Sequence, residues 1–426
     1  MARLRAVRAL PPIFAALAAS IACGAAEATP AAVSPGAGTT PSSTSTPASP
    51  AIPAPSVAIE RLDASPECDG LLPDGAPPAP VSAVFAPGAG ATCGGGVSDG
   101  TGHVALGAGL ATGGSLFEAH APDGAPMGRF TAVAIAPEPA GWHGLTVDPG
   151  PSALQPRVDD VVFAPDGAAI AVKTVSPDPA TATAFRWSFA QDPLGGGGES
   201  VSSTLLAGNH WFRIDAHRTD AAGTPRASTT PVVSDFEPGA PAFLAMGIAR
   251  GGGALVLWQR SGLVHLQWLG PDGAPVGTEG VDGTLAAVLG TFDLAAIRAA
   301  DVALVALLDG SLALRVNGAW RRTYAPGAAP APAPAWLVAH DGWTLRFTRG
   351  ARGYALLPPA GGAATPCGQT IDVADASGRL CGRVAIRIDP GACIVGAIDQ
   401  GWDGTVVAQD AAGACTYHWW TGLLAG

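Results

Sequence analysis

The feature that most constrains this chain is a five-residue motif that recurs along it. Pro-Asp-Gly-Ala-Pro stands at residues 73–77, 122–126 and 271–275, and Pro-Asp-Gly-Ala stands at residues 165–168. In such a motif Pro presets the first central position of a turn, Asp caps the turn with its side chain, and Gly takes the positive φ that follows. Each copy therefore predicts a hairpin turn between two β-strands.

The spacing of these turns indicates a repeat. Two weaker copies, at Asp220 and Asn317, extend the series, and the successive markers are Asp74, Asp123, Asp166, Asp220, Asp272 and Asn317. Their spacings of 49, 43, 54, 52 and 45 residues fit a β-propeller blade better than a leucine-rich or ankyrin repeat. For residues 57–426 we therefore expect an all-β fold, a single propeller of about seven blades, with six to eight compatible.

Apolar runs of strand length lie between the turns. Residues 243–248, 254–258 and 263–269 predict three strands of one meander. The further candidate strands are residues 160–163, 211–214, 302–308, 312–316, 336–338, 343–347 and 384–388. One alternative stays open, because the apolar residues between 285 and 297 also fit the period of a helix. The 58 Gly and 40 Pro of the chain argue against long helices elsewhere.

The first residues have the pattern of an export signal. Arg3, Arg5 and Arg8 precede an apolar run at 13–19, which is too short to span a bilayer, since a spanning helix needs about 20 residues. The following Ser20-Ile-Ala-Cys-Gly resembles the lipobox of bacterial lipoproteins, although that family usually has Leu where this chain has Ser20. The resemblance implies a signal peptide at 1–22, acylation of Cys23, and outer-membrane residence from Gly24. Ordinary small-residue cleavage without acylation remains the alternative.

Residues 23–56 are predicted to be a lipid-anchored linker. They consist mainly of Ala, Pro, Ser, Thr and Gly and contain almost no large apolar side chain. Such a composition cannot bury enough surface to fold. The expected organisation is thus a signal peptide at 1–22, a linker at 23–56 and a repeat domain at 57–426.

The chain has seven cysteines, and their number indicates whether it folds in an oxidising or a reducing compartment. Acylation of Cys23 would leave six that can pair under oxidising conditions: Cys68, Cys93, Cys367, Cys381, Cys393 and Cys415. Nearest-neighbour pairing predicts Cys68 with Cys93, Cys367 with Cys381, and Cys393 with Cys415. A bridge from Cys68 or Cys93 to Cys415, which would join the ends of a ring, is the main rival among the other connectivities. A zinc site is disfavoured because no pair has a two-residue gap.

Few residues carry a signal for chemistry. Residues 96–100, Gly-Val-Ser-Asp-Gly, match a nucleophile elbow, but they lack the flanking strand and helix that this motif requires, so we interpret them as a Gly-rich loop. The pairs at 159–160 and 399–403 are interpreted as turn caps rather than calcium ligands. We expect no catalytic residue, metal or cofactor. The candidate binding residues are Trp211, Asp215 and His217, which would share one face of a strand, and Trp419 and Trp420.

The net charge of the chain limits the class of molecule that it can be expected to bind. The formal net charge is −11, and it becomes −14 without the three N-terminal arginines, which disfavours nucleic acid. With its signal segment, linker and turn repeat, the chain resembles divergent β-propeller-like lipoproteins of GC-rich, myxobacteria-like bacteria. The expected function is a non-enzymatic, exported, monomeric binding or scaffold lipoprotein at the outer membrane or cell surface, which recognises an envelope protein or glycan and meets the membrane through its lipid alone. The alternatives are a periplasmic or secreted location, a propeller-type hydrolase or lyase with funnel carboxylates, and a structural envelope component.

Overall fold

A computed structural model gives the fold of the chain. It divides the chain into two units, Met1–Pro53 and Ala54–Gly426. The residues that it describes all belong to the second unit, and they are 55–110, 114–138, 141–148, 157–174, 182–191, 198–206, 211–218, 230–236, 242–293, 301–359, 368–387, 399–400, 403–409 and 415–424. The predicted signal peptide, Cys23, Cys367 and Cys393 therefore lie outside the described residues. No helix in these ranges is long and apolar enough to cross a bilayer.

The described strands form seven antiparallel sheets of four or five strands. Sheet 1 contains β3 (Thr92–Ser98), β4 (Val104–Gly109), β5 (Ser115–His120) and β6 (Pro126–Ala132). Sheet 2 contains β7 (Ala134–Glu138), β8 (Gly141–Asp148), β9 (Arg157–Phe163) and β10 (Ala169–Thr174). Sheet 3 contains β11 (Ala182–Gln191), β12 (Gly198–Leu206), β13 (Trp211–Arg218) and β14 (Thr230–Phe236).

The next two sheets follow the same order of strands. Sheet 4 contains β15 (Ala242–Ile248), β16 (Ala254–Arg260), β17 (Leu263–Leu269) and β18 (Pro275–Thr284). Sheet 5 contains β19 (Val302–Ala306), β20 (Leu312–Val316), β21 (Ala319–Tyr324) and β22 (Ala331–Pro332). In sheets 1 to 5 each strand pairs with the next strand along the chain, so each sheet is a simple meander.

The last two sheets combine both ends of the described chain. Sheet 6 contains β23 (Thr344–Phe347), β24 (Gly353–Leu357), β25 (Gly368–Asp375) and β26 (Leu380–Arg387), and β1 (Ser56–Arg61) pairs with β26 as a fifth strand. Sheet 7 contains β27 (Asp399–Gln400), β28 (Val406–Gln409) and β29 (Cys415–Trp420), and β2 (Val81–Phe85) pairs with β29 as its fourth strand.

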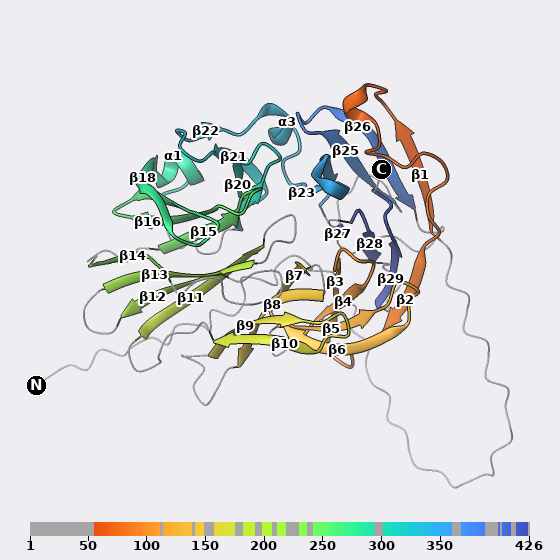
Figure 1. Cartoon of the computed structure of the whole chain (residues 1–426), viewed down its shortest axis with the longest axis horizontal. Helices are drawn as coiled ribbons and strands as arrows, with labels where there is room; N and C mark the ends of the chain where they lie inside the picture. The colour runs from red at the N-terminus through yellow and green to blue at the C-terminus, as the bar shows by residue number, and fades with distance from the viewer. Residues whose placement is uncertain are drawn as a thin grey trace, which may run out of the picture. The chain divides into compact units, whose positions relative to one another are not determined.

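The sheets follow one another around a centre (Figure 1). First strands of successive sheets lie in contact, as β11 does with β15, β15 with β19, and β3 with β7. The ring continues from the last sheet to the first, because β28 of sheet 7 contacts β3 of sheet 1. The all-β propeller predicted from the sequence is confirmed, and its expected range of six to eight blades includes the seven sheets.

The Pro-Asp-Gly turns occupy equivalent places only in part. Asp123, Asp166 and Asp272 each lie between the third and fourth strands of a sheet, and each carboxylate accepts a hydrogen bond from the backbone N–H two residues later at 2.9–3.0 Å. Asp74, by contrast, lies between β1 and β2, and Asn317 joins the second and third strands of sheet 5. The equivalent turn of sheet 5 contains Pro326 and Gly327 and has no Asp at this place.

Two local predictions need correction. Residues 336–338 are not a strand, because they lie in the short helix α3 (Ala335–Val338). Of the stretch 285–308, residues 294–300 lie outside the described residues; its described part contains the short helix α1 (Leu285–Leu289) and the strand β19. Thr284 caps α1, and Gly290 ends it in the left-handed conformation with φ 81°, which Gly adopts without steric cost.

The core lies between neighbouring sheets. The largest apolar cluster joins sheets 4, 5 and 6 and includes Leu257, Leu314 and Tyr354. A second cluster joins sheets 6 and 7, and a third joins sheets 7 and 1. All but the last residue of β16 are buried. This burial on both faces explains why the strands show only weak alternation in the sequence.

Candidate functional site

Trp419 and Trp420, proposed from the sequence as binding residues, are interior side chains. Both are fully buried on β29. Because adjacent strand residues point to opposite faces, Trp419 packs in the cluster between sheets 7 and 1, and Trp420 packs in the cluster between sheets 6 and 7. Their observed role is packing between sheets, and neither offers surface to a ligand in this structure.

Trp211, Asp215 and His217 lie on β13, the third strand of sheet 3. Asp215 pairs with Ser202 on β12 and Pro231 on β14, and His217 pairs with Ser200. The three residues lie on one strand, and the shared face expected from the sequence remains a prediction. Their side chains lie outside the described part of the structure, so a binding role for them remains a prediction.

The Gly-Val-Ser-Asp-Gly sequence forms the end of β3 and its turn into β4, and no helix follows. Ser98 and Asp99 are buried. The Asp99 carboxylate accepts hydrogen bonds from the backbone N–H of Thr101 at 2.7 Å and of His103 at 3.1 Å, and its other oxygen lies 3.0 Å from His103 Nδ1. Asp99 thus caps the turn, but Gly96, Val97 and Ser98 belong to β3, so the loop interpretation holds only for residues 99 and 100.

Sheet 2 contains a buried histidine between two carboxylates. His143 on β8 contacts Asp160 of β9 through Nε2, and its Nδ1 lies 3.6 Å from a carboxylate oxygen of Glu138, at the end of β7. All three side chains are at most 1 % exposed. The adjacent Trp142 points to the other face of β8, into the cluster with sheet 1. Three titratable side chains are thus buried together within sheet 2.

The environment of His143 favours its charged form. Burial alone would lower the pKa of the imidazole, but the hydrogen bond to Asp160 and the interactions with Glu138 outweigh it and raise the pKa to about 9. Lys173 of β10, which pairs with Asp160 in register, has a lowered pKa because it is partly buried. The arrangement holds a proton in the interior at neutral pH.

Sequence reasoning missed this trio. It interpreted Asp159 and Asp160 as turn caps, but Asp160 lies within β9 and is buried. The available signal was alternation, since Val158, Asp160 and Val162 share one face of the strand. An acidic residue at the centre of an inward-facing set predicts a buried charge that needs a partner.

Pairing with a carboxylate is a shared property of several histidines. Besides His143, the described pairs are His103 with Asp99, His120 with Glu118, His265 with Glu279, and His340 with Asp372, at 2.5–3.4 Å. Arg129 also binds Glu118, and Arg383 also binds Asp372. In four of the five, including His143, both partners come from one sheet or hairpin, whereas His340 follows α3 and reaches Asp372 on β25 of sheet 6. These pairs give each histidine a carboxylate partner for its polar ring atoms, either within one sheet or between two elements of the fold.

One serine lies beside a histidine. Ser82 Oγ on β2 is 2.7 Å from Nδ1 of His418 on β29. Ser82 is exposed, whereas His418 is fully buried. The pair therefore ties the outermost strand of sheet 7 to its neighbour.

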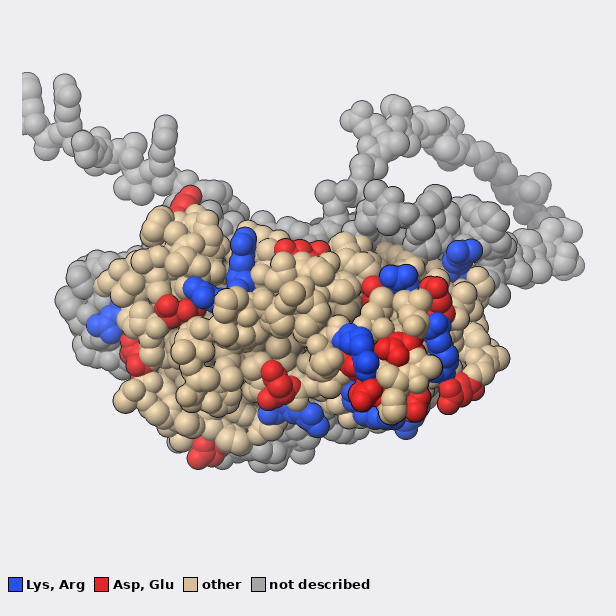
Figure 2. Space-filling view, turned by 90° about the horizontal axis from the view of Figure 1, so that it is seen from above, with Lys and Arg blue, Asp and Glu red and all other residues tan. Residues whose placement is uncertain are grey.

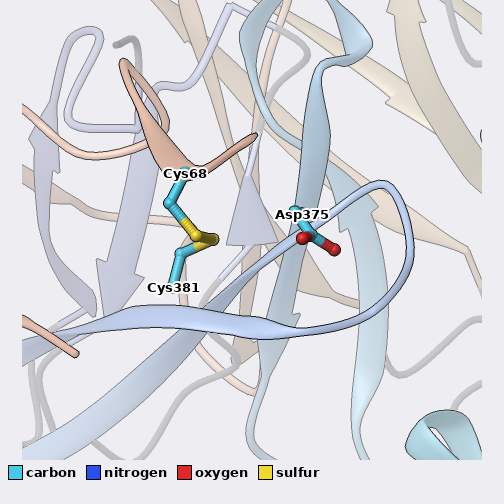
Figure 3. A group of neighbouring side chains, drawn as sticks. All are labelled: Cys68, Asp375 and Cys381. Carbon is cyan, nitrogen blue, oxygen red and sulfur yellow. A yellow bond between two sulfur atoms is a disulfide. The ribbon is translucent and has the colours of Figure 1, made fainter. Parts of the chain in front are cut away.

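One group of potential metal-ligating atoms occurs in the described residues, formed by Cys68, Asp375 and Cys381 (Figure 3). The two sulfur atoms are bonded to each other, so neither is a thiolate that could bind a metal. The Asp375 carboxylate accepts hydrogen bonds from Ser377 and Arg379, which lower its pKa against the opposing effect of burial. The group is a disulfide beside a capped turn.

The nearest-neighbour disulfide prediction is wrong for the described cysteines. The observed bridges are Cys68–Cys381 and Cys93–Cys415, with Cα–Cα distances of 5.4 and 5.3 Å. The rival prediction of a bridge to Cys415 is confirmed for Cys93. Both bridges connect the start of the described chain with its end, which nearest-neighbour logic cannot anticipate because strand pairing across the ring is long-range.

The charged surface is uneven. Figure 2 shows one side on which Lys, Arg, Asp and Glu gather with both signs mixed, beside a broad area without charge. One network with both signs is centred on Arg379, which contacts Asp63, Glu67 and Asp375 at 2.9–3.4 Å. Exposed ion pairs of this kind contribute little stability singly, but this network joins the N-terminal segment to sheet 6.

Among the comparisons with known proteins, matches are found only to solved structures. No protein-family model and no curated protein sequence matches the chain. Among solved structures, the Dos1 propeller matches with a TM-score of 0.38 and 10 % identity, covering 78 % of each chain. A prolyl endopeptidase structure matches with a TM-score of 0.43 and 14 % identity, covering 76 % of this chain and 46 % of the other. An endo-arabinase from Bacteroides thetaiotaomicron matches with a TM-score of 0.30 and 11 % identity, covering 59 % and 98 %.

Proposed function

We propose that this chain is an exported lipoprotein that uses a β-propeller to bind an envelope protein or glycan without catalysing a reaction. In this proposal each of the seven sheets is one blade. The signal peptide at 1–22 is removed, Cys23 is acylated, and residues 23–56 hold the propeller away from the outer membrane or cell surface.

The observation that carries the proposal is the pair of disulfides that link distant parts of the propeller. Structural disulfides persist in oxidising compartments outside the cytoplasm. The N-terminal Arg residues, apolar run and Ser-Ile-Ala-Cys sequence supply a route of export and an anchor. Two acyl signals are sufficient for stable membrane attachment.

The commitment of histidines to structural pairs supports a binding role over a catalytic one. His103, His120, His143, His265 and His340 contact carboxylates that also belong to strands, turns or connections of the fold. An imidazole held in this way stabilises the sheets.

The anchor is tested by labelling cells that express the chain with radioactive palmitate. Wild type is expected to take up label and to sediment with membranes, while Cys23→Ala is expected to lose the label. Ser20→Leu, which restores the usual lipobox residue, is the matched control and should retain or increase labelling. Equal labelling of wild type and Cys23→Ala would contradict acylation at this residue.

Binding is tested with the full-length lipoprotein in its membrane. Cross-linking in intact envelopes, together with a glycan array, is expected to give one defined protein or glycan that is competed by the unlabelled chain. Turnover of an ester, peptide or glycoside by the purified chain would contradict the non-catalytic assignment.

A further inference from the structure

The stretch from residue 55 to residue 93 crosses three consecutive sheets. Its β1 is the fifth strand of sheet 6, its β2 is the fourth strand of sheet 7, and Cys93 lies in β3, the first strand of sheet 1. These three sheets surround the place where the two ends of the propeller chain meet. One continuous segment therefore spans the closure of the ring.

The connection between β1 and β2 is fixed to sheet 6. The backbone N–H groups of Leu62 and Asp63 donate to the Cys381 carbonyl at 2.9 and 3.2 Å. Leu71 and Leu72 are 1 % exposed and pack in the cluster between sheets 6 and 7. The Arg61 guanidinium donates to the Leu72 carbonyl at 3.0 Å. Apolar contacts and hydrogen bonds thus hold the connection on both sides of the Cys68–Cys381 bridge.

The second bridge joins sheet 7 to sheet 1. Cys415 lies at the start of β29 and Cys93 lies in β3. On the same side of β29, the Tyr417 hydroxyl lies 2.8 Å from the Gly94 carbonyl and 2.6 Å from the Gly107 carbonyl. A side chain at Gly96 would meet Val407 of β28 at 2.5 Å, so Gly at this position permits the close approach of the two sheets.

We propose that residues 55–93 form a clasp that keeps the ring closed when tension acts on the N-terminal end of the chain. This inference rests on the proposed function, because a surface-anchored linker would deliver its pull to residue 55. The register of β1 with β26 runs from Ser56 opposite Arg387 to Arg61 opposite Gly382. Pulling from the N-terminal side breaks these pairs in that order and then reaches Cys68–Cys381.

The two disulfide bridges limit how many residues a pulling force can detach from the propeller. A backbone hydrogen bond contributes about 0.5–1.5 kcal/mol net, so the pairs of an edge strand can separate in turn, whereas the covalent bridge stays. Only residues 55–67 precede Cys68, which limits detachment to about 45 Å at about 3.5 Å per residue. With both bridges formed, the shortest covalent path between the two ends of the chain crosses the Cys93–Cys415 bridge, so this path bypasses residues 94–414.

The clasp is tested by pulling single full-length molecules between handles at residue 24 and at the C-terminus. Under oxidising conditions the gain in contour length is expected to exclude residues 94–414. After reduction of the same folded molecules, it should increase by about 1,100 Å, at about 3.5 Å per residue. Handles replace the lipid, so the result is independent of whether Cys23 is acylated.

Paired variants separate the two bridges. In Cys68→Ala/Cys381→Ala, residues 94–414 stay protected as in oxidised wild type, but residues 69–92 detach without a covalent stop at residue 68. In Cys93→Ala/Cys415→Ala, the protected residues are instead 69–380. The proposal is overturned if oxidised wild type extends over its full length, or if reduction leaves both the opening force and the extension unchanged. Reduction after folding keeps the test decisive even where a variant does not fold.

Discussion

The junction between sheets 4 and 5 and the junction between sheets 7 and 1 solve the same packing problem differently. At the first, Gly247 of β15 lies against Leu304 of β19, and a large apolar cluster continues across the sheets. At the second, Gly96 lies against Val407, but a disulfide and the Tyr417 hydroxyl are added to a smaller apolar cluster. Sheets 4 and 5 are consecutive in the chain, whereas sheets 7 and 1 come from its two ends.

The difference indicates that burial is sufficient where the chain itself holds two sheets together. Where the ends meet, separation of the sheets gains the conformational entropy of both chain ends, which burial must offset. A covalent bridge removes much of that gain by restricting the unfolded chain.

The largest expected effect is the loss of both bridges. Cys68→Ala/Cys381→Ala/Cys93→Ala/Cys415→Ala is expected to lose about 2–4 kcal/mol of unfolding free energy per bridge. Urea denaturation measures the loss, and hydrogen exchange should show earlier opening in β2 and β29 than in β15 and β19. Equal hydrogen-exchange protection at the two junctions would contradict the difference that we infer between them.

The next effect concerns the apolar junction. Leu314 on β20 is fully buried in the cluster of sheets 4, 5 and 6, so Leu314→Ala is expected to cost about 2–5 kcal/mol through lost burial and a cavity. Val338→Ala, at a position that is 45 % exposed, is the control and should cost less than about 0.5 kcal/mol. Equal losses for the two variants in urea denaturation would contradict this account of the junction.

A third test concerns sheet 2, whose interior contains the buried His143, Asp160 and Glu138 side chains beside its apolar residues. The pKa of His143 is raised from 6.5 to about 9 in the folded chain, so its contribution is complete below about pH 6.5 and is lost as the pH rises through about 9. At about 1.4 kcal/mol per pKa unit, the effect is at most of the order of 3 kcal/mol. Thermal unfolding between pH 6 and pH 10 should show this decline in wild type and a flatter profile in His143→Gln. Parallel profiles would exclude His143 as its source.

The smallest effect concerns the turns. Asp166 is exposed and accepts the Ala168 N–H at 2.9 Å, so Asp166→Ala should cost about 1 kcal/mol. Asp166→Asn keeps an acceptor oxygen and removes the charge, and it should cost less than half as much. Chemical denaturation of the two variants distinguishes capping from charge, and a larger loss in the Asn variant would favour charge.

Much of the fold was predictable because the turns and apolar runs are local signals. Asp123, Asp166 and Asp272 mark equivalent corners, and residues 263–269 and 312–316 coincide with β17 and β20. The motif reports turn chemistry rather than position in a blade, which is why Asp74 and Asn317 lie at other places. Residues 336–338 were mispredicted because a short apolar run fits a strand or a buried helix equally.

The candidate sites were less predictable because they depend on long-range pairing. Addition of β1 to sheet 6 and of β2 to sheet 7 brings Cys68 to Cys381 and Cys93 to Cys415, over sequence separations of 313 and 322 residues. Burial of Trp419 and Trp420 follows from the same closure, since β29 lies between two packed layers. The alternation of side chains along a strand predicts that Trp419 and Trp420 point to opposite faces of β29. It does not predict which sheets cover those faces.

Closure of the propeller by its own N-terminal segment is tested most directly by disulfide mapping of the full chain. Digestion without reduction, followed by mass spectrometry, should yield one peptide pair joining Cys68 to Cys381 and another joining Cys93 to Cys415. A peptide pair joining Cys68 to Cys93 would contradict the closure.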